Sequence, residues 1–294
     1  MDQKRINIVL VCDDFYSVLL VAFLKSIEIN HKSSEIVDVY IVDDSISKLS
    51  KKNIIESIDQ DKIVLHWIKM SEAIPKDISL PFVNNAYPLN IFIRLLIPYF
   101  IPATVEKIIY FDVDMIMLDD ISNLWNIDIG TSVIGAISDT INEEKTIADG
   151  IGNYQELGLD GSAKYFNSGL QVINVKRWLE EDITQKTFDA ITNNKKYATL
   201  SDQYGLNVAL IGKWYEIDPK WSCFSVLTLS DPSLIHYFHR KPIYVDYPYN
   251  YKEEFYYYLN QTKWKNFKPI GKTKRYISKI KNIVQKMKFV LNNK

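Results

Sequence analysis

The sequence has little cysteine, no excess of basic charge and no long apolar run. Cysteine occurs twice among 294 residues, at Cys12 and Cys223, without a Cys-x-x-Cys pair, so we expect reduced, packed thiols in a cytoplasmic protein rather than a disulfide framework. The formal net charge of −1 provides no basic field for nucleic acid, and no nucleic-acid partner is expected. The apolar run Ile6–Val11 is too short for a signal peptide or a membrane span, and no later run reaches the length of a transmembrane helix.

The composition is that of an ordinary globular protein. Apolar residues make up 47% of the chain and charged residues 24%, and a chain of this length can bury a large core. Internal repeats and low-complexity tracts are absent. We expect one large domain over residues 1–265 and an appended tail over residues 266–294.

Short apolar runs alternate with helical patterns along the first two thirds of the chain, which predicts βαβ units and a mainly parallel sheet. Strands are predicted over Ile6–Val11, Val37–Val42, Ile63–Ile68, Lys107–Phe111, Ser132–Ile137 and Leu170–Val175, and helices over Ser17–Ile29, Leu49–Ile58 and Pro88–Phe100. The stretch from Thr140 to Gly161 has no clear period, and we expect a mobile loop over the site there.

The most informative motif is Asp112-Val113-Asp114, which directly follows the predicted strand Lys107–Phe111. Residues i and i+2 of an extended chain share a face, so both carboxylates project from the carboxyl edge of the sheet, where open α/β sheets bind ligands. Paired carboxylates suit a divalent ion that also binds phosphate oxygens. A lone Asp-x-Asp is more often a helix cap or a solvated turn, as we expect for Asp119-Asp120.

Several further motifs accompany this one in a fixed order. The segments are Val11–Tyr16, Phe92–Leu95, Tyr110–Asp114, Gly135–Asp139, Phe166–Gly169, Leu200–Gln203 and His236-Tyr237. Together they resemble the motifs of the retaining, nucleotide-sugar-dependent glycosyltransferases of family 8, which include bacterial lipooligosaccharide galactosyltransferases and glycogenin, over roughly the first nine-tenths of the chain.

The resemblance implies a GT-A fold: a single α/β domain whose mainly parallel sheet includes a Rossmann-like nucleotide-binding half. It also implies a metal site formed by Asp112, Asp114 and His236, and the imidazole favours Mn²⁺ over Mg²⁺, which remains the alternative. The donor-binding residues that it implies are Asp13, Tyr16, Arg94, Asp139, Asn167, Gly169 and Lys241.

Asp202 and Gln203 are the catalytic residues that the resemblance implies. Retention by double displacement needs a carboxylate within bonding reach of the anomeric carbon. An amide is a poor nucleophile, so we favour a front-face route in which the Gln203 carbonyl stabilises positive charge on the sugar and Asp202 orients the donor. The alternative is that Asp202 caps a helix beginning near Gln203, and both roles are compatible.

The segment His236–Ile243 departs from the family pattern, because it lacks the usual glycine and tryptophan and is one residue short. We therefore expect Lys241 to reach the phosphates with altered geometry. Phe15 also replaces a residue that is often polar in the nucleotide loop.

Two regions near the C-terminus have a distinct composition. Nine aromatic residues between Tyr244 and Trp264 suit packing in a core, with sugar stacking as the alternative. From Lys272 onward, apolar residues recur at helical spacing among lysines and arginines with no acid. This basic amphipathic pattern favours an anionic membrane surface, with packing on the protein's own domain as the alternative.

The expected activity is metal-dependent transfer of galactose or glucose, with retention, from a UDP-hexose to a hydroxyl of a glycan, glycolipid or glycoprotein acceptor. The expected location is the cytoplasm, peripheral to the inner face of the membrane. One alternative is a non-catalytic nucleotide-sugar-binding module with the same fold. Another is a metal-dependent nucleotidyltransferase, which is disfavoured because the loop Val11–Tyr16 contains no glycine.

Overall fold

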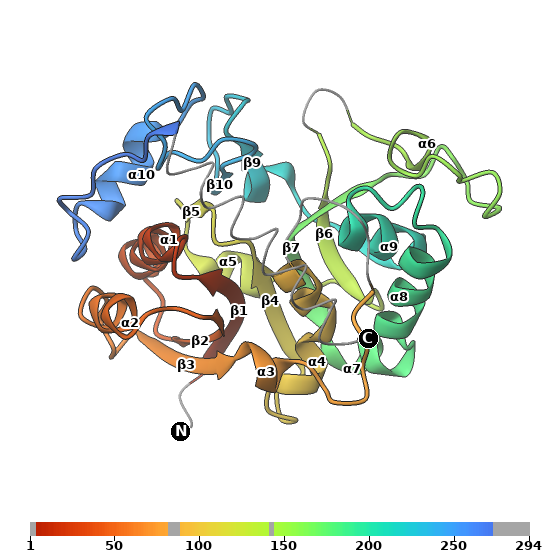
Figure 1. Ribbon diagram of the computed structural model, residues 1–294, viewed down its shortest axis with the longest axis horizontal. Helices are drawn as coiled ribbons and strands as arrows, with labels where there is room; N and C mark the ends of the chain where they lie inside the picture. The colour runs from red at the N-terminus through yellow and green to blue at the C-terminus, as the bar shows by residue number, and fades with distance from the viewer. Residues whose placement is uncertain (1–3, 82–88, 141–143, 273–294) are drawn as a thin grey trace.

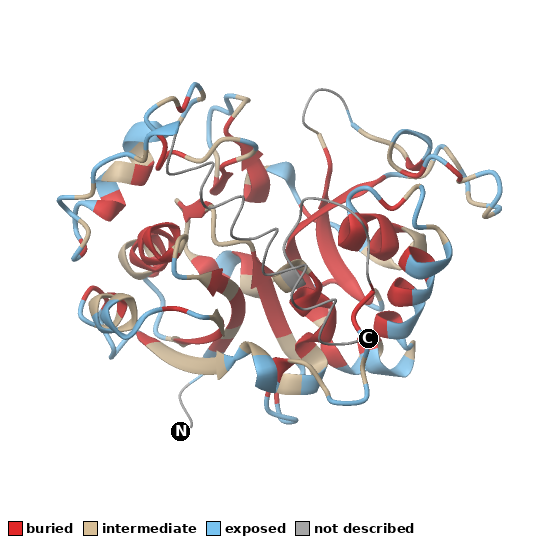
Figure 2. Cartoon of the chain, viewed as in Figure 1, coloured by how far each residue is buried: buried red, intermediate tan, exposed pale blue. Residues whose placement is uncertain are grey.

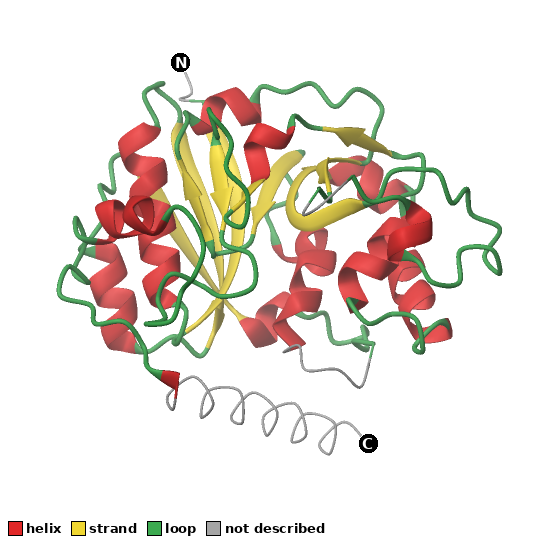
Figure 3. Ribbon diagram, turned by 90° about the horizontal axis from the view of Figure 1, so that it is seen from above, coloured by secondary structure: helices red, strands yellow, loops and turns green. Residues whose placement is uncertain are grey.

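The computed structural model describes residues 4–81, 89–140 and 144–272. A seven-stranded sheet with the order β3-β2-β1-β4-β7-β6-β8 forms its centre, and a three-stranded sheet with the order β5-β10-β9 lies beside it. Helices lie on either side of the large sheet (Figures 1 and 3). The strands are β1 (Arg5–Asp13), β2 (Ile36–Asp44), β3 (Ile63–Lys69), β4 (Lys107–Phe111), β5 (Met115–Met117), β6 (Ile134–Ser138), β7 (Phe166–Asn174), β8 (Trp214–Glu216), β9 (Cys223–Phe224) and β10 (Leu234–His236).

The helices alternate with the strands in the N-terminal half; in the C-terminal half α7 and α9 contact β7, whereas α10 packs against α1. The α-helices are α1 (Ser17–Asn30), α2 (Lys48–Ile55), α3 (Met70–Ala73), α4 (Ile97–Phe100), α5 (Ile121–Trp125), α6 (Ile147–Gly150), α7 (Val175–Glu180), α8 (Ile183–Asn193), α9 (Ser201–Ala209) and α10 (Lys252–Leu259). The described residues also form the 3₁₀ segments η1 (Leu89–Leu96) and η2 (Pro219–Ser222). No helix among the described residues is long and apolar enough to cross a membrane.

The expected mainly parallel sheet is confirmed. Strands β3, β2, β1 and β4 run parallel, and β6 and β8 are parallel to each other. Strand β7 is antiparallel to both of its neighbours, β4 and β6. Because of this reversal, the start of β7 lies at the same edge of the sheet as the end of β4.

Two hydrophobic cores cover the two faces of the sheet. Successive side chains of a strand point to opposite faces, and in β1 Ile8 and Leu10 belong to the core that includes α1, whereas Val9 belongs to the core that includes α8. The sheet is therefore buried on both sides (Figure 2). Both faces of a parallel sheet must be covered in this way, which explains the continuous apolar runs of its strands.

Two expectations from the sequence are corrected. The segment predicted as one helix over Pro88–Phe100 is the 3₁₀ segment η1 followed by α4, and Pro88 lies outside the described residues. Within 140–161, where we expect a loop without regular structure, the described residues form the short helix α6 and a series of hydrogen-bonded turns. Ile147 and Ile151 anchor this part in the core, with 1% and 0% of their surface exposed.

The aromatic region and the tail differ in how far they are described. Tyr244, Tyr247, Phe255 and Tyr258 are buried, as expected of packing residues. The chain remains attached to the domain as far as Ile270, whose N–H donates to the Ile243 carbonyl. The predicted helical tail lies almost wholly outside the described residues.

Candidate active site

Asp112 and Asp114 lie where β4 ends, and the sheet topology brings a histidine to them. Strand β5 begins at Met115 and pairs antiparallel with β10, so that His236 stands opposite Met115. The Tyr237 N–H also donates to the Asp114 carbonyl at 2.9 Å. The pairing of two short strands thus joins the Asp-x-Asp motif to a residue more than a hundred positions away in the sequence.

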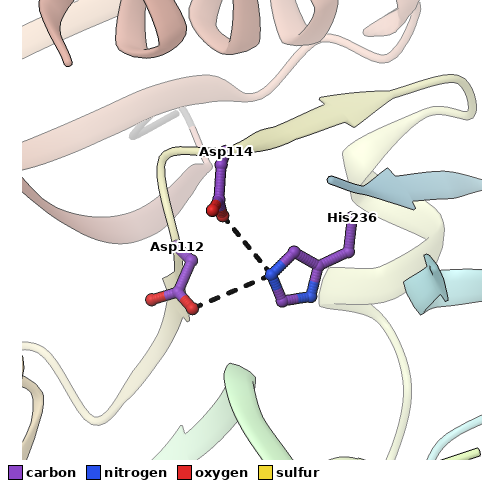
Figure 4. A group of neighbouring side chains, drawn as sticks. All are labelled: Asp112, Asp114 and His236. Carbon is purple, nitrogen blue, oxygen red and sulfur yellow. Dashed lines mark ion pairs between the residues drawn. The ribbon is translucent and has the colours of Figure 1, made fainter. Parts of the chain in front are cut away.

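The side chains of Asp112, Asp114 and His236 converge (Figure 4). His236 Nε2 lies 3.3 Å from Asp114 Oδ1 and 3.9 Å from Asp112 Oδ2. The three potential ligand atoms lie within 4.8 Å of one another. His236 is 5% exposed, and its ring packs against Phe224 at 5.4 Å between centroids.

This group has the properties of a divalent-metal site. Asp114 Oδ1 is buried and has no hydrogen-bond partner among the described residues. Two carboxylate oxygens and an imidazole nitrogen form a donor set suited to Mn²⁺. A methyl group at Gly169 would lie 2.7 Å from His236 Cε1 and 2.8 Å from Asp112 Oδ2. Gly169 is therefore needed to let β7 approach these residues closely.

Arg94 connects the candidate metal-binding residues Asp112, Asp114 and His236, called the metal group below, to Asp202, which is predicted to orient the donor. Its Nη2 donates to Asp112 Oδ1 at 2.9 Å, and its Nε lies 3.1 Å from Asp202 Oδ2. Its Nη1 donates to the carbonyl and hydroxyl oxygens of Ser168 at 2.9 and 3.0 Å. The Tyr110 ring lies beneath the guanidinium, 4.6 Å away. Burial lowers the pKa of Arg94, but the charges of Asp112 and Asp202 outweigh it and raise the pKa above its ordinary value.

Asp202 and Gln203 stand in the first turn of α9 and are 8% and 7% exposed. The N-cap position of α9 is occupied by Leu200, and Asp202 lies inside the first turn, so the alternative that Asp202 caps the start of this helix is wrong. The Gln203 amide donates to Asp139 Oδ2 at 3.3 Å, and its carbonyl accepts from Ser168 N at 3.2 Å. Asn167 also donates to that carbonyl, at 3.3 Å. Gln203 is therefore held at both ends of its amide.

Burial raises the pKa of Asp202, and the Arg94 charge opposes that rise.

The predicted donor-binding Asp139 is 2% exposed, and its Oδ2 also accepts from Lys145 Nζ at 3.0 Å. Lys145 was not predicted as a site residue, because the stretch that contains it shows no local pattern. Asn207 was also missed, although its i+4 position relative to Gln203 places both on one face of α9.

The predicted nucleotide loop, Val11–Tyr16, begins within the strand next to β4 and continues beyond it. Asp13 ends β1, the parallel neighbour of β4, and its Oδ1 accepts from the Tyr16 N–H at 2.9 Å. Burial raises the pKa of Asp13 to about 6, although that hydrogen bond opposes the rise. Burial also raises the pKa of Tyr16, together with Tyr244 and the charges of Asp13 and Asp114. Tyr16 is thus close enough to Asp114 for the carboxylate charge to affect the pKa of its hydroxyl.

Lys241 reaches the metal group rather than open solvent. Its Nζ forms an ion pair with Asp114 Oδ2 and donates to the Tyr237 carbonyl at 2.7 Å. Burial raises the pKa of Asp114, but the Lys241 and His236 contacts outweigh it and hold that pKa below its ordinary value. Between His236 and Lys241, His239 has a φ of 55°. That left-handed conformation favours glycine, the residue that the family pattern usually has in this segment.

Comparison with known proteins defines the class. The sequence profile described as Glycosyl transferase family 8 matches residues 7–252, and the chain belongs to this family of glycosyltransferases with the GT-A fold.

Its relatives differ in how much of their length the chain spans. It is 25% identical over 286 residues to General stress protein A of Bacillus subtilis, covering 89% of this chain and 96% of that protein. It is 24% identical over 230 residues to Lipopolysaccharide 1,2-glucosyltransferase of Escherichia coli, covering 76% of this chain and 63% of that protein. The crystal structure of galactosyltransferase LgtC in complex with donor and acceptor sugar analogues superimposes with a TM-score of 0.73 at 21% identity, over 90% of this chain and 100% of that one.

Proposed function

We propose that this protein transfers a hexose, galactose or glucose, from a UDP-sugar to a hydroxyl of a glycan, glycolipid or glycoprotein, with retention of the anomeric configuration and with a divalent ion, preferably Mn²⁺. The observation that carries the proposal is the continuous network from the Asp112, Asp114 and His236 group through Arg94 to Asp202. The names of the relatives, a glucosyltransferase and a galactosyltransferase, support the choice of sugar.

Asp112, Asp114 and His236 would hold the ion. When bound, it would act as a Lewis acid on the leaving diphosphate, stabilising the charge that develops there without proton transfer. Asp13, at the end of β1, and Tyr16, at the start of α1, would contact the nucleotide. Lys241 would add positive charge beside the phosphates.

The residues on α9 and β7 would act on the sugar. Gln203 is fixed between Asp139 and Ser168, so its amide dipole is preorganised and need not reorient during the reaction. Asp202 forms an ion pair with the Arg94 guanidinium. This pairing fits a role in orienting the donor and does not fit a role as a free nucleophile. Both features support the front-face route, in which the acceptor attacks from the side of the leaving group.

The first experiment measures UDP release from a panel of UDP-sugars with Mn²⁺ and no acceptor. Asp112→Asn and Asp114→Asn are compared with the intact protein, and Asp61→Asn, at an exposed position, is the matched control. Release from one sugar that is lost in both site variants and kept in the control would identify the donor and support the metal role. Release that is unchanged in both variants would contradict the metal site.

The outcome also tests the rival function. If no sugar gives release of UDP but UDP binds in the presence of Mn²⁺, the protein is next tested with a panel of acceptors. Failure with every acceptor would then favour a non-catalytic binding module. Retention itself is tested by NMR of the anomeric configuration of the first product.

We also propose that the basic amphipathic pattern from Lys272 onward, within the predicted tail 266–294, binds an anionic membrane surface, which would place the protein at the inner face of the membrane. Six lysines and arginines between Lys274 and Lys288 with no acid among them support this.

A further inference from the structure

Each carboxylate of the metal group divides its two oxygens between two functions. Asp112 Oδ1 accepts from Arg94 Nη2 at 2.9 Å and from the Tyr110 hydroxyl at 2.7 Å, which leaves Oδ2 on the side of His236. Asp114 Oδ2 is paired with Lys241, which leaves Oδ1 facing His236 Nε2 at 3.3 Å. One oxygen of each aspartate is therefore neutralised by a protein cation, and the other faces the metal position.

The Lys241 ammonium is part of the built site rather than a surface group that touches it. Its side chain is only 19% exposed, and the Tyr237 carbonyl accepts a second hydrogen bond from it at 2.7 Å. Tyr237 is in turn fixed to Asp114 by its own N–H. Lys241, Asp114 and Tyr237 therefore each contact the other two, and Tyr237 directly follows His236.

The charges of this site do not favour a free divalent ion. Two cations, Arg94 and Lys241, compensate most of the negative charge of the three carboxylates Asp112, Asp114 and Asp202. Adding a divalent ion alone would make the buried site net positive. Because the effective dielectric constant is lower inside a protein than in water, such an imbalance weakens binding substantially. The diphosphate of a nucleotide sugar carries negative charge on each phosphate and would restore the balance.

We infer that Lys241 is an internal counter-cation of Asp114 that lowers the affinity for a free divalent ion and so couples binding of the ion to binding of the diphosphate. This inference rests on the proposed metal site and assigns a role that the motif does not specify. Arg94 has the same effect on Asp112, but it also holds Ser168 and Asp202. Lys241 is the cation that can be removed without dismantling that network.

The test is a titration with Mn²⁺, in which electron paramagnetic resonance measures the free ion, with and without UDP. The proteins are the full chain, Lys241→Met, Lys241→Arg and the control Lys213→Met, which removes an ammonium paired with Glu181 away from the site. Circular dichroism and thermal melting verify that each variant is folded.

In the intact protein, UDP is expected to tighten Mn²⁺ binding by about tenfold or more. Lys241→Met is expected to bind Mn²⁺ without UDP on the order of tenfold more tightly than the intact protein, and the enhancement by UDP should shrink. Lys241→Arg retains the charge and should behave like the intact protein, as should Lys213→Met.

Two results would overturn the inference, and they differ in what they say of the proposed function. If Mn²⁺ binds with UDP but Lys241→Met binds the free ion no more tightly than the intact protein, Lys241 is not a counter-cation and the metal site stands. If the intact protein binds no Mn²⁺ even with UDP, the metal-dependent function fails, and the inference fails with it.

Discussion

The Asn207 side chain holds both backbone groups of Phe166. Its Oδ1 accepts from the Phe166 N–H at 2.9 Å, and its Nδ2 donates to the Phe166 carbonyl at 3.0 Å. The same Nδ2 donates to the backbone carbonyl of Gln203 at 2.9 Å. Asn207 is 1% exposed, so it fixes the first turn of α9 to the start of β7, where Asn167 lies.

Replacing Asn207 by leucine should therefore impair both stability and turnover. Buried N–H and C=O groups would lose their partners, which should lower the free energy of unfolding by about 3 kcal/mol. Asn207 is a positioning residue for Gln203, so kcat should fall more than KM rises. Urea unfolding and steady-state kinetics measure the two effects. Asn193→Leu, at an exposed position of α8, should change stability by less than about 0.5 kcal/mol, and unchanged kcat in Asn207→Leu would refute the positioning role.

Gly169→Ala should weaken metal binding without straining the backbone, because Gly169 does not have a positive φ. The added methyl group would lie 2.7 Å from His236 Cε1 and would force the histidine away from the carboxylates. We expect Mn²⁺ affinity in the presence of UDP to fall by about tenfold or more, measured by the same resonance titration. Gly271→Ala, where nothing lies within 4 Å of the new methyl group, is the control. Equal affinities of the two variants would show that β7 has room to move.

Asp13 should make the protein less stable as the pH rises. Its pKa is raised from 3.8 to about 6 in the fold, chiefly by burial, so the folded state keeps a proton that the unfolded state loses. The stability present below about pH 4 is lost as the pH rises to about 6, by about 2 kcal/mol. Asp13→Asn keeps an acceptor for the Tyr16 N–H and should be more stable than the intact protein at pH 7 but not at pH 4. Urea unfolding at both values measures this, and a gain in stability that is equal at pH 4 and pH 7 would rule out titration as its cause.

His239→Gly should stabilise the segment between His236 and Lys241. A φ of 55° is unfavourable for a residue with a Cβ atom, and glycine adopts it freely. Because glycine also loses more backbone entropy on folding, the expected net gain is about 0.5 to 1 kcal/mol in urea unfolding. His239→Ala removes the ring but keeps the Cβ atom, so it should show no gain; equal stability of the two variants would point to the ring instead.

Removing residues 272–294 should abolish sedimentation with anionic liposomes, since the basic amphipathic pattern is confined to them. UDP release by the domain should be unaffected. Liposomes of neutral lipid are the control, because binding that depends on basic charge should be absent there. Undiminished sedimentation of the shortened protein with anionic liposomes would exclude the tail as the membrane-binding element.

Local signals were sufficient for much of the fold. The strand Lys107–Phe111 is observed with the predicted bounds, and Asp120 caps α5 by accepting from the Ser122 N–H, as expected of the Asp119-Asp120 pair. Strand patterns and caps depend on neighbouring residues, so they can be read from a short window. The segment η1 was misjudged because 3₁₀ and α-helical turns share nearly the same apolar spacing.

The sequence by itself determined which chemical groups stand at the ends of the strands, because residue type and strand period depend only on the local chain. Tertiary structure decided which of these groups meet. The antiparallel pairing of β5 with β10 places His236 beside Asp114, and the reversal of β7 brings Ser168 to Arg94. The partners of Lys241 and Asn207 were likewise settled by packing. Such contacts join residues far apart in the sequence, and they form only when burial of both faces of the sheet fixes the register and direction of its strands.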